Sequence, residues 1–366
     1  MRVRASRATV RETLKRYRYR VLVAAALLLA LVAAPGSAQV RLLGPPQTER
    51  PVPIEVGFFL IDIVEVDDGH KTFEFEGILT LNWYDERQRF DPVEEGIAEK
   101  VYQGDYQFSE LATGWWPQLV LRNESGHYDR QGVVLRILPD GNVTYVEELQ
   151  AVAEVHMDLR RIPFDRQRFE VVFEVLGFDA SEVLLTADPD ETGASDGLSV
   201  TQWRMESLTA EDRTYQATFN SGREELVSAV AFEFPVDRNS GFLLRMIVLP
   251  LLILVGLSWS VFWMDAESLG ERMEISFVGL LTVVAFQIVV SDMLPRIPYF
   301  TILSSFLLIS YLTLVAGVIV NLRVGALDRQ GDRAVGNRLD MTCRWLFPLG
   351  YLSAIALMTT YYFLRY

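Results

Sequence analysis

The chain has 366 residues, half of them hydrophobic, and a mean hydropathy of +0.17. This composition is too apolar for an ordinary soluble enzyme and too charged for a protein lying wholly in a membrane, so two kinds of domain are expected. Residues 39–244 carry 17 basic and 39 acidic side chains, whereas residues 245–366 carry 9 and 8. The acidic charge excludes nucleic acid as a partner. It serves solubility or concentrates cations near the surface.

The N-terminus is typical of an export signal. Residues 1–20 hold eight Lys or Arg and one acid, residues 21–34 are an apolar run, and residues 36–38 (GSA) fit a signal-peptidase site. We therefore expect a signal peptide over residues 1–38. The alternative is an uncleaved anchor helix, but a span needs about 20 apolar residues and this run has 14.

Residues 39–240 show short alternating runs broken by turns, with little helical periodicity. The runs are residues 72–76, 133–138, 142–146, 169–173 and 227–234, and a turn signal (PDG) occupies residues 139–141. This pattern predicts an extracellular, immunoglobulin-like β-sandwich. The only cysteine, Cys343, excludes an intrachain disulfide, so the core or self-assembly must hold this domain together. The acidic loop 188–196 supplies oxygen ligands for a divalent cation, or is simply solvated.

Residues 241–366 predict a membrane domain of four helices. The expected spans are residues 246–264, 271–292, 297–322 and 345–364. Pro250 lies inside the first span, where neighbouring helices can satisfy the freed backbone group. The connection over residues 323–344 holds five Arg and three Asp, which places it in the cytoplasm. The predicted fold class is therefore an all-β extracellular domain followed by an all-α transmembrane bundle.

The second span carries acids at both ends of one helix face. Steps of four and three residues place the following side chains on that face: Glu274, Val278, Leu281, Ala285, Ile288 and Asp292. A carboxylate within a span normally faces a bundle interior or a water-filled cavity. Several copies around an axis would form two acidic rings separated by a hydrophobic constriction, as in a gated cation pore. Leu281 and Ile288 are the gate candidates; packing against lipid or core is the alternative for Val278, Leu281 and Ile288.

Five motifs occur in order along the chain. They are residues 83–85 (WYD), residues 115–117 (WWP), Asp158 with residues 163–167 (PFDRQ), Pro250, and residues 294–299 (LPRIPY). Together they resemble the pentameric ligand-gated ion channels, or Cys-loop receptors, in their prokaryotic branch, with a likeness to the amine-gated bacterial members. The two half-cystines of the signature loop would fall at Val155 and Phe169, so the bridge is absent.

The resemblance implies a homopentamer in a bacterial inner membrane that conducts monovalent cations, needs no cofactor and is not an enzyme. Cation-selective relatives carry an acid before the basic residue at the inner end of the pore helix, and Glu271 precedes Arg272 here. The selectivity residues are therefore expected to be Glu271 and Glu274. The carboxylates of five copies repel each other, which favours pH-dependent conductance.

The resemblance also implies residues for coupling and for agonist binding. Phe164 is expected to dock near the loop that holds Pro295 and Pro298, and Asp165 to lie close to Arg238. The positions of the family's aromatic box correspond to Ile78, Arg122, Leu176 and Val227, with Asn123, Glu174, Phe178, Tyr215 and Phe219 nearby. Glu174 would neutralise an amine, whereas Arg122 would pair with a carboxylate ligand.

Three functions compete at this stage. The first is a cation channel opened by a small extracellular ligand bound between subunits. The second is a channel opened mainly by pH, with Glu274, Asp292, the acidic domain and the three histidines (His70, His127 and His156) as titrating groups. The third is an exported enzyme on a membrane anchor. No Ser-His-Asp order, metal-spaced His/Cys set or nucleotide loop supports it, and one anchor would suffice where four spans are expected.

Overall fold

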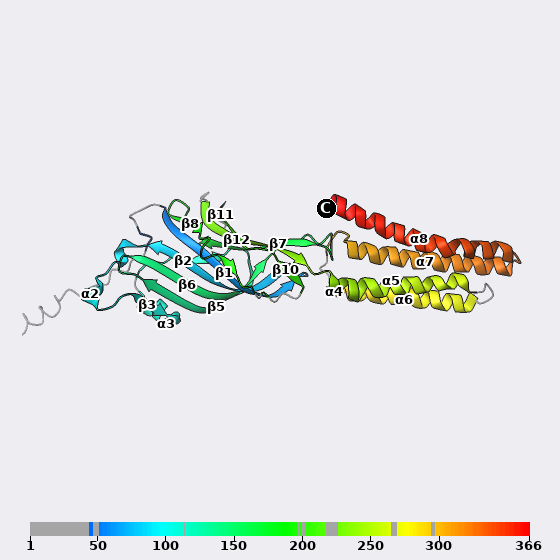
Figure 1. The fold of residues 1–366 in the computed structure, drawn as a ribbon, viewed down its shortest axis with the longest axis horizontal. Coiled ribbons are helices and arrows are strands. Elements are labelled where there is room, and N and C mark those ends of the chain that lie inside the picture. Colours follow the sequence, from blue (N-terminus) through cyan, green and yellow to red (C-terminus); the bar gives the residue numbers. More distant parts are fainter. Residues whose placement is uncertain are drawn as a thin grey trace, which may run out of the picture. The chain divides into compact units, whose positions relative to one another are not determined.

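The structure is a computed structural model, and it confirms a sheet-rich domain followed by membrane helices (Figure 1). The described residues are 44–46, 51–112, 114–196, 198, 202–216, 226–264, 269–293 and 297–366. The expected signal peptide, Phe219 and Pro295 lie outside them.

The strands form two sheets. The larger sheet has the order β3-β5-β6-β2-β1-β8, with β9 pairing β1, and the smaller has the order β10-β12-β7-β4, with β11 pairing β12. The larger sheet comprises β1 (Val52–Asp67), β2 (Thr72–Tyr84), β3 (Lys100–Gln103), β5 (Glu124–Ile137), β6 (Asn142–Glu154), β8 (Val183–Ala187) and β9 (Gly193–Ala194). The smaller comprises β4 (Leu119–Leu121), β7 (Arg166–Val175), β10 (Trp203–Met205), β11 (Thr209–Gln216) and β12 (Leu226–Arg238). Two short helices, α2 (Pro92–Glu95) and α3 (Gly104–Tyr106), lie between β2 and β4 in the chain.

The sheets pack through the apolar positions of the alternating runs, because side chains in a strand point to opposite faces in turn. Phe73 on β2 and Phe169 on β7 are stacked with ring centroids 4.8 Å apart. Val155 and Phe169, at the first and second half-cystine positions, are both buried. Apolar packing therefore occupies the positions that hold a disulfide in other members of the family that the sequence resembles.

Strand β7 departs from simple alternation at Val172. This side chain is 2% exposed and packs with Ala229, Ala231 and Tyr215 on the other face of the smaller sheet. Strand β11 pairs with the edge of β12 and covers that face with Tyr215. Both faces of β7 are therefore buried at this point.

Among the described residues, four helical stretches are long and apolar enough to cross a membrane. They are Gly241–Trp263, Leu269–Ser291, Ile302–Arg329 and Arg333–Arg365. The first contains α4 (Gly241–Leu243), a π-helical turn (Leu244–Val248), α5 (Leu249–Ser258) and a 3₁₀ turn (Trp259–Trp263). The others are α6 (Leu269–Met293), α7 (Ile302–Arg329) and α8 (Arg333–Arg365).

The bounds of the third and fourth helices differ from the sequence expectation. The third span begins at Ile302 rather than residue 297, because Thr301 caps the helix: its hydroxyl accepts from Ser304 N at 3.0 Å. The expected connection over residues 323–344 is mostly helical, since α7 continues to Arg329 and α8 starts at Arg333. The helices extend through this polar stretch because its charged side chain Asp340 is buried and pairs with Arg272 on α6, as described below.

Candidate functional site

The acidic and aliphatic face of α6 is uncovered within one chain. Val278, Leu281 and Ile288 are 58%, 72% and 60% exposed, and Glu274 and Ala285 are also exposed. Asp292 lies in the last turn of the same helix. An apolar side chain that no other part of its own subunit covers must meet lipid, a neighbouring copy or a pore.

The opposite face of α6 packs inside the bundle. Arg272, Ser276 and Val283 are buried, as are Gly279 and Val290. At about 100° per residue these positions lie roughly 160° around the helix axis from the face of Glu274 and Leu281. The rotation of α6 within its subunit is therefore defined, and it turns the predicted pore face outward from the bundle.

Arg272 anchors the buried face of α6. Its guanidinium donates to both carboxylate oxygens of Asp340 on α8, at 2.7 and 3.0 Å, and to the Asn321 amide oxygen on α7 at 3.0 Å. The Asn321 amide nitrogen donates to Ser276 Oγ at 2.9 Å. The sequence analysis missed Asn321 and Asp340, although Asn321, a polar side chain in an apolar span, was an available signal.

The expected contact between Asp165 and Arg238 is present at the end of β12. Arg238 donates from Nε and Nη2 to the Asp165 carboxylate at 2.8 and 3.2 Å, and from Nη1 to Asp68 at 2.7 Å. Its guanidinium also lies 4.0 Å from the centroid of the Trp203 ring. Burial works to lower the pKa of Arg238, but hydrogen bonds to Asp68 and Asp165 outweigh it, so the pKa is raised. The sequence analysis did not identify Asp68, which lies in the turn between β1 and β2.

The signature loop between β6 and β7 contacts the start of α7. The Ile302 amide donates to the Arg160 carbonyl at 2.9 Å, and the Leu159 amide donates to the Tyr299 hydroxyl at 3.4 Å. Pro298 is exposed beside Tyr299. The Phe164 ring has its aromatic contact with Phe363 on α8, at a centroid distance of 6.1 Å. The described part of the 295–299 loop is therefore contacted by Leu159 and Arg160, and Phe164 contacts the last helix.

Three of the ligand candidates form one cluster on the smaller sheet. Arg122 Nη1 lies 2.5 Å from Glu174 Oε2, and the guanidinium lies 4.1 Å from the centroid of the Tyr215 ring. The Glu174 carboxylate is 9% exposed. Because the two charges pair with each other, a charged ligand at this cluster must displace one of them.

The remaining ligand candidates are dispersed. Ile78 lies on β2 in the larger sheet, so only a second copy could bring it to a site on the smaller sheet. The Asn123 amide bonds the backbone of Glu154, Glu170 and Val172, which gives it a structural role. Leu176 is exposed, and Phe178 packs edge-on against Trp115.

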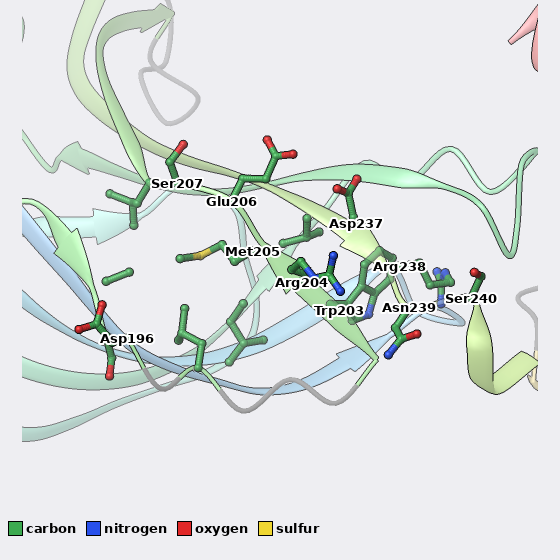
Figure 2. A pocket seen from close by; sticks show the side chains of 16 residues that line it. Asp196, Trp203, Arg204, Met205, Glu206, Ser207, Asp237, Arg238, Asn239 and Ser240 are labelled. Carbon is green, nitrogen blue, oxygen red and sulfur yellow. The ribbon is translucent and has the colours of Figure 1, made fainter.

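A cavity of about 840 Å³ lies between β10, the end of β12, residues 194–196 and Leu198. Figure 2 shows Arg204, Glu206 and Asp237 among its lining side chains, together with Trp203 and Arg238. None of the eight described residues predicted for ligand binding lines it. Among the described residues, no group of three or more His, Cys, Asp or Glu side chains could hold a metal ion.

The turn between β1 and β2 also holds a histidine–carboxylate pair. His70, in the turn beside Asp68, places Nδ1 2.8 Å from an Asp67 oxygen. This hydrogen bond raises the pKa of His70 and lowers the pKa of Asp67. The pair therefore stabilises the turn where both groups are charged. The histidine contribution is complete below about pH 6.5 and is lost as pH rises through the raised pKa.

We expect His70→Gln to lower the melting temperature of the detergent-solubilised protein slightly at about pH 5.5 and to leave it unchanged at about pH 9. The effect is small because His70 is fully exposed. Differential scanning fluorimetry at both pH values checks this, with His156→Gln as the control histidine. A larger loss at high pH would contradict the assigned sign.

Comparison with known proteins gives matches to both parts of the chain. Residues 40–240 match the neurotransmitter-gated ion-channel ligand binding domain, and residues 247–330 match the neurotransmitter-gated ion-channel transmembrane region. A proton-gated ion channel of Gloeobacter violaceus is 27% identical over 319 residues, which cover 87% of this chain and 86% of that protein.

Animal receptor subunits are also similar. A gamma-aminobutyric acid receptor subunit beta of Caenorhabditis elegans is 28% identical over 242 residues, 65% of this chain and 42% of the subunit. An acetylcholine receptor subunit beta of Xenopus laevis is 25% identical over 257 residues, 68% of this chain and 50% of the subunit. The matched residues span about half the length of these two subunits or less.

Proposed function

The chain belongs to the neurotransmitter-gated, or pentameric ligand-gated, ion-channel family, and on that premise we propose that five copies form a cation-selective channel in a bacterial inner membrane. The family comprises channels rather than enzymes, so the anchored enzyme is set aside. The agonist is a small extracellular molecule bound between subunits. Monovalent cations permeate.

The observation that carries this proposal is the orientation of α6. Its buried face is held by Arg272 and Ser276, and its acidic and aliphatic face is left free for an axis shared with other copies. Glu271 and Glu274 are both exposed near the inner end of that helix. Five copies then place rings of carboxylates next to a hydrophobic constriction at Leu281 and Ile288. Rings of carboxylates favour the passage of cations.

The extracellular site is proposed to use the cluster of Arg122, Glu174 and Tyr215 on one subunit. Ile78 lies on the other sheet, and a neighbouring copy supplies it. An amine would take the place of Arg122 at Glu174, and a carboxylate would take the place of Glu174 at Arg122. We propose coupling from this domain to the pore through Asp165, Arg238 and the contacts of Phe164 and Tyr299, next to Pro298.

A second candidate function is opening by extracellular pH without a dedicated agonist. The Gloeobacter violaceus relative is named a proton-gated ion channel. In this chain His70 and Asp67 form a titrating pair next to Asp68, which holds Arg238. Current recordings from reconstituted protein distinguish opening by protons from opening by an agonist. Current is measured first across pH, and then with amines and carboxylates at a pH where the channel is closed.

Glu274→Ala tests the pore assignment in the same recordings. We expect the ratio of cation to anion permeability to fall about threefold or more, since one unit charge at ~6 Å in water contributes that much. The reversal potential in asymmetric KCl measures the ratio. Glu94→Ala, an exposed acid on α2, is the control and is expected to leave the ratio unchanged. An unchanged ratio in Glu274→Ala would place the selectivity ring elsewhere.

A further inference from the structure

The inner end of the pore helix carries two opposite charges in adjacent positions, Glu271 and Arg272. If both reached the pore, they would largely cancel. The structure separates them: Glu271 is exposed, whereas Arg272 is 0% exposed inside the bundle. Only the acid is therefore available to ions at this level of α6.

The buried guanidinium is neutralised by a side chain 68 positions away in the sequence. Asp340 on α8 accepts two hydrogen bonds from Arg272 in a bidentate arrangement, and it is itself 4% exposed. Bidentate pairing of a planar guanidinium with a carboxylate is strong and directional. Asn321 accepts a third hydrogen bond, so the shell around the charge is formed by α7 and α8.

We propose that Asp340 is a specificity-determining residue of the channel, which acts by holding the positive charge of Arg272 out of the ion path. This inference rests on the proposed cation selectivity. Asp340 touches no ion and works through Arg272, so it is a positioning residue. The last helix, α8, thereby affects the net charge at the pore, because it supplies the carboxylate that neutralises Arg272 on α6.

The physical step is the cost of an unpaired buried charge. Without the Asp340 carboxylate, the Arg272 guanidinium is buried with only Asn321 as a side-chain partner among the described residues. An uncompensated buried ion is strongly destabilising, and a long arginine side chain can carry its charge to water while its stem stays packed. The nearest exposed polar side chain on the same helix is that of Glu271, so the charge emerges at the inner mouth and offsets the acidic ring.

Asp340→Asn keeps the shape and removes the charge. The full-length protein, reconstituted in planar bilayers, is expected to show a cation-to-anion permeability ratio at least about threefold below wild type, from one unit charge per subunit. The double variant Arg272→Gln/Asp340→Asn removes both charges and is expected to restore the wild-type ratio. A role of Asp340 in stability alone would lower the amount of assembled channel and leave the permeability ratio of the remaining channels unchanged.

Asp328→Asn is the matched control, because Asp328 lies at the same end of the bundle, 3.0 Å from Arg333 Nε. We expect it to keep the wild-type ratio. An anion-selective wild type would overturn the proposed function, whatever the variants do. With a cation-selective wild type, an unchanged ratio in Asp340→Asn overturns the role of Asp340.

Assembly is checked by size-exclusion chromatography. Should Asp340→Asn fail to assemble, the double variant decides alone: a wild-type ratio supports the proposal, and a lowered ratio or the absence of channels overturns it, since no unpaired ion then remains to explain the defect.

Discussion

Leu281→Ser is expected to produce channels that open at a stimulus at least about tenfold weaker than wild type requires. Wetting a leucine side chain costs about 1.5–3 kcal/mol relative to burying it, and serine removes most of that cost in each subunit. About 1.4 kcal/mol changes an equilibrium constant tenfold. The free-energy change from the substitution in a single subunit is therefore enough to produce the expected shift. Voltage-clamp recording of the concentration or pH of half-maximal current measures the shift.

Leu357→Ser is the matched control for this prediction. Leu357 on α8 is 72% exposed in a single chain, the same fraction as Leu281, but it does not lie on α6. We expect its gating to equal that of wild type. Equal shifts in both variants would mean that any polar substitution on the helices promotes opening, and unchanged gating in Leu281→Ser would move the constriction elsewhere.

Arg238→Gln is expected to abolish current and to lower the thermal stability of the protein strongly. Arg238 is 3% exposed and pairs with Asp165, which is 1% exposed. Removing one partner of a buried ion pair costs about 3–5 kcal/mol, because the remaining charge is left uncompensated. Thermal unfolding of purified protein measures the stability, and recordings at saturating stimulus measure the current.

The control is Arg168 on β7, which is 73% exposed and pairs with Glu233 on β12. Arg168→Gln is expected to cost about 0–1 kcal/mol. Within the buried cluster, Asp165→Asn is expected to lower the thermal stability more than Asp68→Asn. Asp68 is 16% exposed, so water can replace part of its contact with Arg238. Equal and small effects of Arg238→Gln and Arg168→Gln would contradict a role for the buried cluster in stability.

Local periodicity accounts for the accurate part of the sequence analysis. The run at residues 72–76 became part of β2, and the turn at residues 139–141 joins β5 to β6. The face of Glu274 and Leu281 was deduced from steps of three and four residues, and those residues are on one exposed side of α6. Such patterns depend only on backbone geometry, which neighbouring residues determine.

These local patterns could not predict contacts between residues that are far apart in the sequence. The Asp165–Arg238 contact was expected only through a family resemblance, and Asp68, the third member of the cluster, was not found. Residues 323–344 were expected to be a cytoplasmic connection, on the count of their charges alone. Instead Asp340 is buried, because Arg272 on another helix compensates its charge.

The sequence by itself determined the class of protein: an acidic β-domain, four apolar spans and one span with carboxylates on a single face, because composition and periodicity are local properties. The tertiary structure alone decided which charges are available to ions and ligands. Glu271 is exposed while Arg272 is neutralised by Asp340, and Arg122 is paired with the carboxylate of Glu174. The physical reason is that the effect of a charge depends on its burial and its partner, and folding brings those partners from distant parts of the chain.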